Sequence, residues 1–269
     1  TVGGYAVLAG GQVTNSNVIA AHAGKVVLAA ADRVSLDIVG DGLISVSVDQ
    51  NVLNASAINS GRIEADGGTV LLTARNANAL LDTVVNNSGV IRANSLVERN
   101  GEIVLDGGGA GITSNSGVLE ATGLESGMTG GTIKVLGDKV GLFAGSRLVA
   151  SGDTGGGRVL IGGNLQGKGP EHNASRTHVD RAVTVSADAV TSGDGGTVIV
   201  WADDTTSFSG AISAKGGAQR GNGGFVEVSG KRNLGFDGTV NTTAVNGETG
   251  MLLLDPDDLY VGADPNPGV

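Results

Sequence analysis

The stretch GDGGTVIVWADDTTSFSGAISAKGG, which begins at Gly193, decides the fold because the chain repeats its pattern 28 residues later. The second copy, GNGGFVEVSGKRNLGFDGTVNTTA, begins at Gly221. Each copy holds a glycine turn, an alternating apolar strand, a polar corner and a second strand that ends in Gly-x-Ile/Val. A repeat of 20 to 50 residues is typical of a stack of equivalent coils. The pattern therefore predicts a solenoid.

A second series of short motifs has the same spacing. Its members read NSGRIEA, NSGVIRA, NSGVLEA and AGSRLVA, and their glycines are Gly61, Gly89, Gly117 and Gly145. An earlier member, NSNVIA, begins at Asn15. Glycine and asparagine tolerate the positive φ of a tight corner between strands. The asparagines at one position of this series predict a ladder of stacked side-chain amides; they are Asn59, Asn87 and Asn115.

Composition narrows the fold class. Of the 269 residues 48 are glycine and only 4 are proline, without a strict Gly-X-Y period, which excludes collagen. Hydrophobic residues reach 40% but aromatic residues only 3%, so the core must consist of Val, Ile, Leu and Ala. Glycine costs about 1 kcal/mol at each helix-interior position, which argues against helices. We expect an all-β protein, a parallel β-helix of about ten coils, whose strands alternate between inward apolar and outward polar residues.

Charge and cysteine content exclude several partners. The formal net charge is −10, and a nucleic-acid partner would require clustered Lys and Arg. The chain has no cysteine and no apolar run of 18 residues, so we expect neither disulfides nor membrane insertion. No phosphate-binding motif is complete, and the histidine spacing matches no established metal site. We therefore expect no cofactor and no metal.

Several blocks resemble the filamentous-haemagglutinin-like exoproteins of two-partner secretion, which are large bacterial surface adhesins. These blocks follow the order of that family; they are GKVVLAAADRVSLDIVGDGLISVSVD, ADGGTVLLTARNANALLDTVVNNSGVI, ERNGEIVL, GDGGTVIVWADDTTSFSG, GGFVEVSGK and GMLLLDP. The resemblance implies a right-handed β-helical shaft on a secreted or surface-attached protein. It also implies passage through an outer-membrane β-barrel transporter. The Asn-Pro-Asn motifs of the family's secretion domain are absent, so we expect this segment to lie downstream of that domain.

The repeat also predicts the domain boundaries. We expect a β-helical shaft over residues 1–254, interrupted by a loop around 162–181, where the glycines leave their spacing. Residues 255–269 hold three of the four prolines. Proline removes ladder donors and stops the stacking of coils, so this tail is expected to link the shaft to a further module.

The interruption supplies the candidate contact residues. It carries His172, Arg176, His178 and Arg181, and the chain's single tryptophan, Trp201, follows it. Arginine and histidine in an exposed loop can hydrogen-bond glycans, which suggests a surface glycan, a matrix polysaccharide or a host receptor as partner. Two structural alternatives stay open. In one the loop merely covers a coil edge, and in the other the tryptophan serves only to cap a rung or to pack.

The resulting functional prediction is a structural or adhesive segment of a secreted bacterial adhesin, active in attachment, aggregation or biofilm, and not an enzyme. The alternative is a carbohydrate-active β-helix, a polysaccharide lyase or hydrolase. The acid pairs that such an enzyme would use are Asp203-Asp204 and Asp257-Asp258. Adjacent residues on a strand point to opposite faces, so neither pair is poised for glycoside hydrolysis.

A third interpretation is a crystal-binding β-solenoid, which would require a flat outward ladder of threonines. Thr69, Thr132 and Thr197 share a position after the repeat glycine. Other residues interrupt this row; they are Glu102, Arg158 and Phe225. A row so interrupted does not favour this interpretation.

Overall fold

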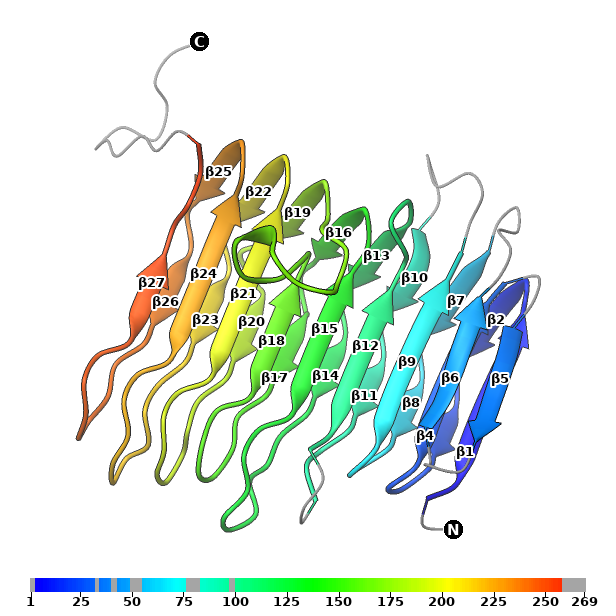
Figure 1. The fold of residues 1–269 in the computed structure, drawn as a ribbon, viewed down its shortest axis with the longest axis horizontal. Helices are drawn as coiled ribbons and strands as arrows, with labels where there is room; N and C mark the ends of the chain where they lie inside the picture. The colour runs from blue at the N-terminus through cyan, green and yellow to red at the C-terminus, as the bar shows by residue number, and fades with distance from the viewer. Residues whose placement is uncertain are drawn as a thin grey trace.

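The computed structural model describes residues 3–31, 34–39, 43–48, 55–75, 83–96 and 100–257. Their strands form a parallel β-helix with three long sheets (Figure 1). The chain rises along the front sheet, returns behind it, and advances steadily from right to left in this view, which is a right-handed winding. The fold predicted from the repeat is therefore confirmed.

Each coil contributes one strand to each sheet. Sheet A contains β1 (Tyr5–Gly10), β4 (Lys25–Ala30), β9 (Thr69–Ala74), β12 (Glu102–Asp106), β15 (Thr132–Leu136), β18 (Arg158–Ile161), β21 (Thr197–Ala202), β24 (Phe225–Gly230) and β27 (Met251–Leu253). Sheet B contains β2 (Gln12–Asn15), β7 (Ser56–Asn59), β10 (Thr83–Asn87), β13 (Ile112–Asn115), β16 (Lys139–Leu142), β19 (Arg176–Val179), β22 (Thr205–Phe208) and β25 (Asn233–Phe236). Sheet C contains β3 (Val18–Ala20), β8 (Arg62–Glu64), β11 (Val90–Arg92), β14 (Val118–Glu120), β17 (Arg147–Val149), β20 (Thr184–Ser186), β23 (Ala211–Ser213) and β26 (Thr239–Asn241). The described residues thus form eight complete coils, and β27 begins another.

The interior follows the predicted alternation. Val198 and Val226 pair in register on β21 and β24, and both side chains are fully buried. Burying a valine side chain stabilises a fold by about 1.5–3 kcal/mol, and one continuous cluster of such residues runs through all the coils. Aliphatic side chains at equivalent positions therefore supply most of the core. The expectation that the core is wholly aliphatic is wrong, because Phe208 is fully buried in it and stacks on Phe236.

The predicted asparagine ladder exists and is longer than expected. Each amide Nδ2 donates to the Oδ1 of the next coil, at 2.8 Å from Asn15 to Asn59, 2.8 Å from Asn59 to Asn87, and 2.7 Å from Asn87 to Asn115. The ladder ends where Asn115 donates to the hydroxyl of Ser146. These bonds satisfy polar groups that burial would otherwise leave unpaired.

Glycines are required beside this ladder because the stacked corners touch. A Cβ atom on Gly117 would lie 2.0 Å from the carbonyl oxygen of Gly89. The predicted alignment of Gly117 with Gly145 is wrong by one residue, because Val118 pairs with Arg147. The corner between β16 and β17 is longer than the corner before it, so Ser146 occupies the place opposite Gly117.

One hairpin departs from the repeat between the first two coils. Strands β5 (Val34–Val39) and β6 (Leu43–Val48) pair antiparallel and are drawn in front of β4 in Figure 1. Val27 and Ala29 on β4 do not belong to the core cluster, yet both are fully buried. A covered outer face of β4 explains their burial.

Helical structure is nearly absent from the described residues. A short 3-10 helix, η1 (Leu165–Gly167), is the one helical element there. Within the described part of the chain, no helix has the length and apolar character needed to cross a membrane.

The segment between β18 and β19 is the second departure from the repeat. It spans residues 162–175 and is here called the cover loop. The predicted interruption, 162–181, was too long because Arg176–Val179 form β19, where Thr177 and Val179 alternate inward. The last strand in the described part of the chain ends at Leu253, and residues 258–269 of the expected linker lie outside that part.

Candidate functional site

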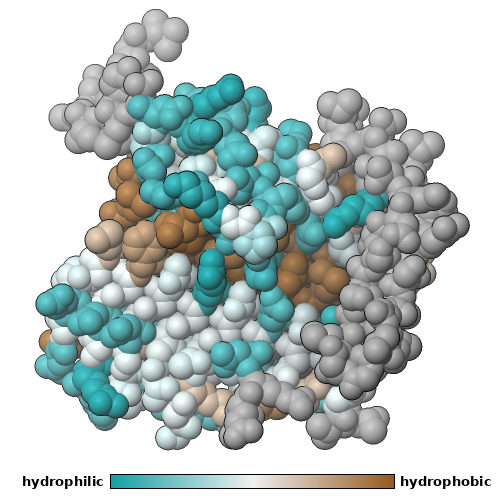
Figure 2. Space-filling view, viewed as in Figure 1, coloured by the Kyte–Doolittle hydropathy of each residue, from teal (hydrophilic) through white to brown (hydrophobic). Residues whose placement is uncertain are grey.

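The cover loop crosses the outer face of sheet A in front of β18 and β21 (Figure 1). Figure 2 shows hydrophilic surface crossing an apolar band on this face. Leu160, Ile199 and Trp201 form a separate apolar cluster on these strands, and Phe225 packs against it. The loop thus shields outward apolar residues that the coil alternation would leave in water.

Trp201 is the centre of this covered cluster. Its side chain is only 4% exposed, and its Nε1 donates to Asp203 Oδ1 at 2.9 Å. The loop residue Gly167 approaches so closely that a Cβ atom there would lie 2.8 Å from the ring. The ring therefore packs under the loop and has no free face on which a sugar could stack.

A network of charged side chains fastens the middle of the loop. Lys134 Nζ lies 3.0 Å from Glu102 Oε1 and 3.1 Å from Glu171 Oε1. Asn164 donates to Glu171 and accepts a 3.2 Å hydrogen bond from Arg158. Burial alone would raise the pKa of Glu171, but the hydrogen bonds from Asn164 and Lys134 outweigh it and lower that pKa. The ionised carboxylate is thus the form that holds the loop.

The loop's tip also covers a carboxyl group. Glu227 points outward from β24 but is fully buried, and the backbone N–H of Gln166 donates to it. Burial raises the pKa of Glu227, although the hydrogen bonds from Gln166 and Ser229 act in the opposite direction.

His172 stays on the sheet A side of the molecule. Its Nε2 lies 3.5 Å from Asp106 Oδ1. Arg181 lies instead in the turn after β19, highly exposed, and pairs with Asp237. In the described part of the chain no three His, Cys, Asp or Glu side chains are grouped to hold a metal ion.

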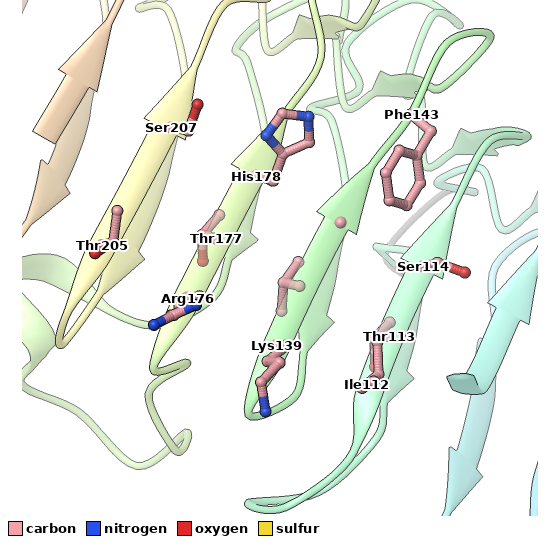
Figure 3. Close-up of a pocket in the computed structure, with 12 residues that line it drawn as sticks. Ile112, Thr113, Ser114, Lys139, Phe143, Arg176, Thr177, His178, Thr205 and Ser207 are labelled. Carbon is pink, nitrogen blue, oxygen red and sulfur yellow. The ribbon is translucent and has the colours of Figure 1, made fainter. Parts of the chain in front are cut away.

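The other two predicted residues, Arg176 and His178, line a groove on the outer face of sheet B (Figure 3). The sheet B groove has a volume of about 300 Å³ and crosses four strands: β13, β16, β19 and β22. Two rows of paired positions form its floor. One row reads Ser114, Gly141, His178 and Ser207, and the other reads Ile112, Lys139, Arg176 and Thr205.

Phe143 closes one end of the groove, just after β16. Its ring centroid lies 5.9 Å from that of His178, with the ring planes tilted by 40°. The sequence analysis missed Phe143 and Lys139. The available signal was the alternation in KVGLF, which places Lys139, Gly141 and Phe143 on one face.

The five predicted contact residues therefore do not form one site. Arg176 and His178 share the sheet B groove, whereas His172 and Trp201 belong to the cover loop's contacts with sheet A. The winding of the coil explains the separation, because the cover loop lies over sheet A before the chain continues into β19 of sheet B.

The acidic residues near the loop also separate. Asp203 lines a cavity of about 500 Å³ beside Trp201, together with Asp255 and Asp257. Its neighbour Asp204 lies 3.7 Å from Arg176 Nε instead. Asp203 accepts hydrogen bonds from Trp201 and Asn173, so it helps to hold the loop. Asp258 lies outside the described residues.

The fold and these surfaces define a parallel β-helix whose outer faces carry a covering loop and a shallow groove. The chain is similar to a solved structure, the HMW1 secretion domain from Haemophilus influenzae, at 28% sequence identity and a TM-score of 0.74. The match covers 94% of this chain and 64% of that one. No protein-family model matches the chain. No curated protein matches it either.

That comparison bears on one expectation from the sequence. The matched structure is itself a secretion domain. The expectation that the segment lies downstream of such a domain therefore gains no support from it.

Proposed function

We propose that this chain is a β-helical segment of a secreted bacterial adhesin that is exported by two-partner secretion. The observation that carries the proposal is the likeness to the HMW1 secretion domain over 94% of the chain. The sequence blocks that resemble filamentous-haemagglutinin-like exoproteins point to the same route. An outer-membrane β-barrel transporter is the partner that this route requires.

The physical organisation of the chain suits such a route. It has no cysteine, so no disulfide has to pass a narrow pore. Every coil pairs with the coil before it in all three sheets, so folding can propagate from one end as the chain emerges. Burial of each new coil then opposes backward movement.

The segment's role outside the cell is to present its coil faces for attachment to a glycan, a matrix polysaccharide or a receptor. The cover loop and the sheet B groove are two non-repetitive features that are available for this among the described residues. Specific contacts require such features, because a regular coil face offers the same surface at every turn. The role is adhesive and not catalytic.

Surface labelling tests this assignment. A short epitope inserted after Gly169, in an exposed part of the cover loop, should be labelled by antibody on intact cells that produce the full-length protein. An equivalent epitope on a periplasmic protein provides the control for leaking cells. Labelling that appears only after the outer membrane is permeabilised would contradict the proposal.

A further inference from the structure

The sheet B groove arises where one strand lacks an outward side chain. Gly141 stands in the row between Ser114 and His178, and it leaves a gap between them. Phe143 bends back over that gap, since a Cβ atom on Gly141 would lie 2.6 Å from Phe143 Cε2. The depression and the aromatic ring therefore come from one local arrangement on β16.

Phe143 is exposed in a chain with few aromatic residues. Its side chain is 45% exposed, although the chain has only 4 phenylalanines. Phe143 does not belong to the core cluster, so its ring contributes nothing to the inward stack. A large apolar ring left beside a hollow is a feature that binding surfaces share.

Two cations stand side by side at the other end of the groove. Lys139 and Arg176 are directly paired across β16 and β19, and Figure 3 shows their nitrogen atoms at the same end. Like charges at directly opposite positions of neighbouring strands are destabilising. Lys139 Nζ lies 2.7 Å from Asp138, and Arg176 Nε lies 3.7 Å from Asp204. Lys139 has three N–H donors and Arg176 has five, so a ligand carboxylate can bind to the two cations beside these pairs.

Hydroxyl groups complete the lining. Ser114, Thr205 and Ser207 come from the flanking strands β13 and β22. A sugar combines an apolar C–H face, which buries against an aromatic ring, with hydroxyl groups that exchange hydrogen bonds with serine and threonine. An acidic sugar adds a planar carboxylate, the anion that the arginine fork matches best.

We propose that the sheet B groove binds a carboxylate-bearing saccharide. The sugar ring packs against the exposed side of the Phe143 ring, which itself rests on Gly141, and the sugar carboxylate lies between Lys139 and Arg176. This inference rests on the proposed function, because the groove can meet such a saccharide only if the segment lies outside the cell. The net charge of −10 repels acidic polymers from the molecule as a whole, so binding depends on these local cations and weakens with salt.

Isothermal titration of the purified chain provides the test. The probes are a galacturonic acid hexasaccharide, a neutral cellohexaose and a κ-carrageenan hexasaccharide, which carries sulfates but no carboxylate. The uronate should bind, the neutral sugar should bind at least about tenfold more weakly, and the sulfated sugar should bind more weakly than the uronate. No heat with the uronate, equal binding of the neutral sugar, or preference for the sulfated sugar would each overturn the proposal.

Variants locate the site. Lys139→Gln combined with Arg176→Gln should weaken uronate binding at least about tenfold, because two charge-assisted contacts are lost. Gly141→Val should weaken binding by pushing the Phe143 ring out of its place, because an added side chain there meets that ring. Phe143→Ala should remove the apolar contact, whereas Phe143→Tyr should retain binding. Lys168→Gln combined with Arg181→Gln is the charge-matched control, because both residues are exposed outside the groove. Groove variants that remain folded by circular dichroism and bind like the parent would overturn the assignment.

Failure of this inference can be told apart from failure of the proposed function. Titration in solution does not depend on export, and surface labelling of the cover loop does not depend on the groove. If intact cells are labelled but the purified chain binds no uronate, only the saccharide site is contradicted. A uronate-binding segment that never reaches the surface would contradict only the proposed function.

Discussion

The backbone N–H of Gln166 lies 3.0 Å from Glu227 Oε2, and the two residues are 61 positions apart in the sequence. Gln166 adopts a positive φ of 52°, a conformation that non-glycine residues rarely occupy. The contact closes the cover loop over a carboxyl group that β24 would otherwise present to water. Loop and sheet are thus joined at a group whose ionisation is disfavoured by burial.

Substitution Glu227→Gln should change the pH dependence of stability. Burial holds the folded pKa of Glu227 above its ordinary value of 4.5. Below pH 4.5 the carboxyl group is mostly protonated in both the folded and the unfolded protein, so its burial does not lower the free energy of unfolding. As pH rises through 4.5 and then the folded pKa, the parent loses stability that the glutamine variant retains.

Thermal unfolding of both proteins between pH 4 and pH 7 measures this difference. The melting temperature of the variant minus that of the parent should increase towards pH 7. Other titrating groups are common to both proteins and cancel. A difference that is constant, or that decreases as pH rises, would show that the burial of Glu227 does not control its ionisation.

Substitution Glu171→Gln should loosen the cover loop. The ionised carboxylate accepts hydrogen bonds from Asn164 and Lys134, and the variant loses the charge that makes these contacts strong. Trypsin should therefore cleave faster after Lys168, which is exposed in the loop. Cleavage after Arg181, outside the loop, serves as the internal reference. Unchanged relative rates would rule out this network as the loop's anchor.

Substitution Asn87→Ala should interrupt the asparagine ladder. It removes the acceptor of Asn59 and the donor to Asn115, both at buried positions. The expected cost is about 2–3 kcal/mol in the free energy of unfolding, because buried polar groups lose their partners. The matched control is Asn86→Ala, whose side chain faces outward and accepts from Ser114. Equal denaturation midpoints for the two variants would contradict a stabilising ladder.

Substitution Val226→Asp places a charge in the stack of inward side chains. Val226 is fully buried in the core cluster, so the variant should lose at least about 3 kcal/mol in the free energy of unfolding. Thr197→Asp, at an outward position of β21, should cost far less. Chemical denaturation of the two variants tests the inside-outside assignment, which fails if they unfold together.

The coil architecture was predictable because its signals are local and repeated. Alternation placed Val198 and Val226 inward, and the recurring asparagines predicted the ladder from Asn59 to Asn115. The register at Ser146 was mispredicted because one corner is longer, and glycine spacing alone does not reveal which side of a corner gains residues.

The site was less predictable because its contacts are not local. Nothing in the sequence of the cover loop shows that it lies on sheet A, since its partners Glu227 and Trp201 come from later coils. The sheet B groove likewise combines four strands, and its defining feature is a missing side chain at Gly141. Exposure of Phe143 could be suspected from alternation, but the hollow beside it depends on the neighbouring coils.

Export dependence on the transporter tests the central claim most directly. The chain would be placed behind a periplasmic signal peptide, alone and fused after the HMW1 secretion domain, in cells with and without the corresponding outer-membrane transporter. The account predicts release of the fused chain into the medium, folded and protease-resistant, only in cells that contain the transporter. Release of the unfused chain would further show that it carries transporter recognition itself. Retention of both forms in the periplasm when the transporter is present, or equal release without it, would contradict the account.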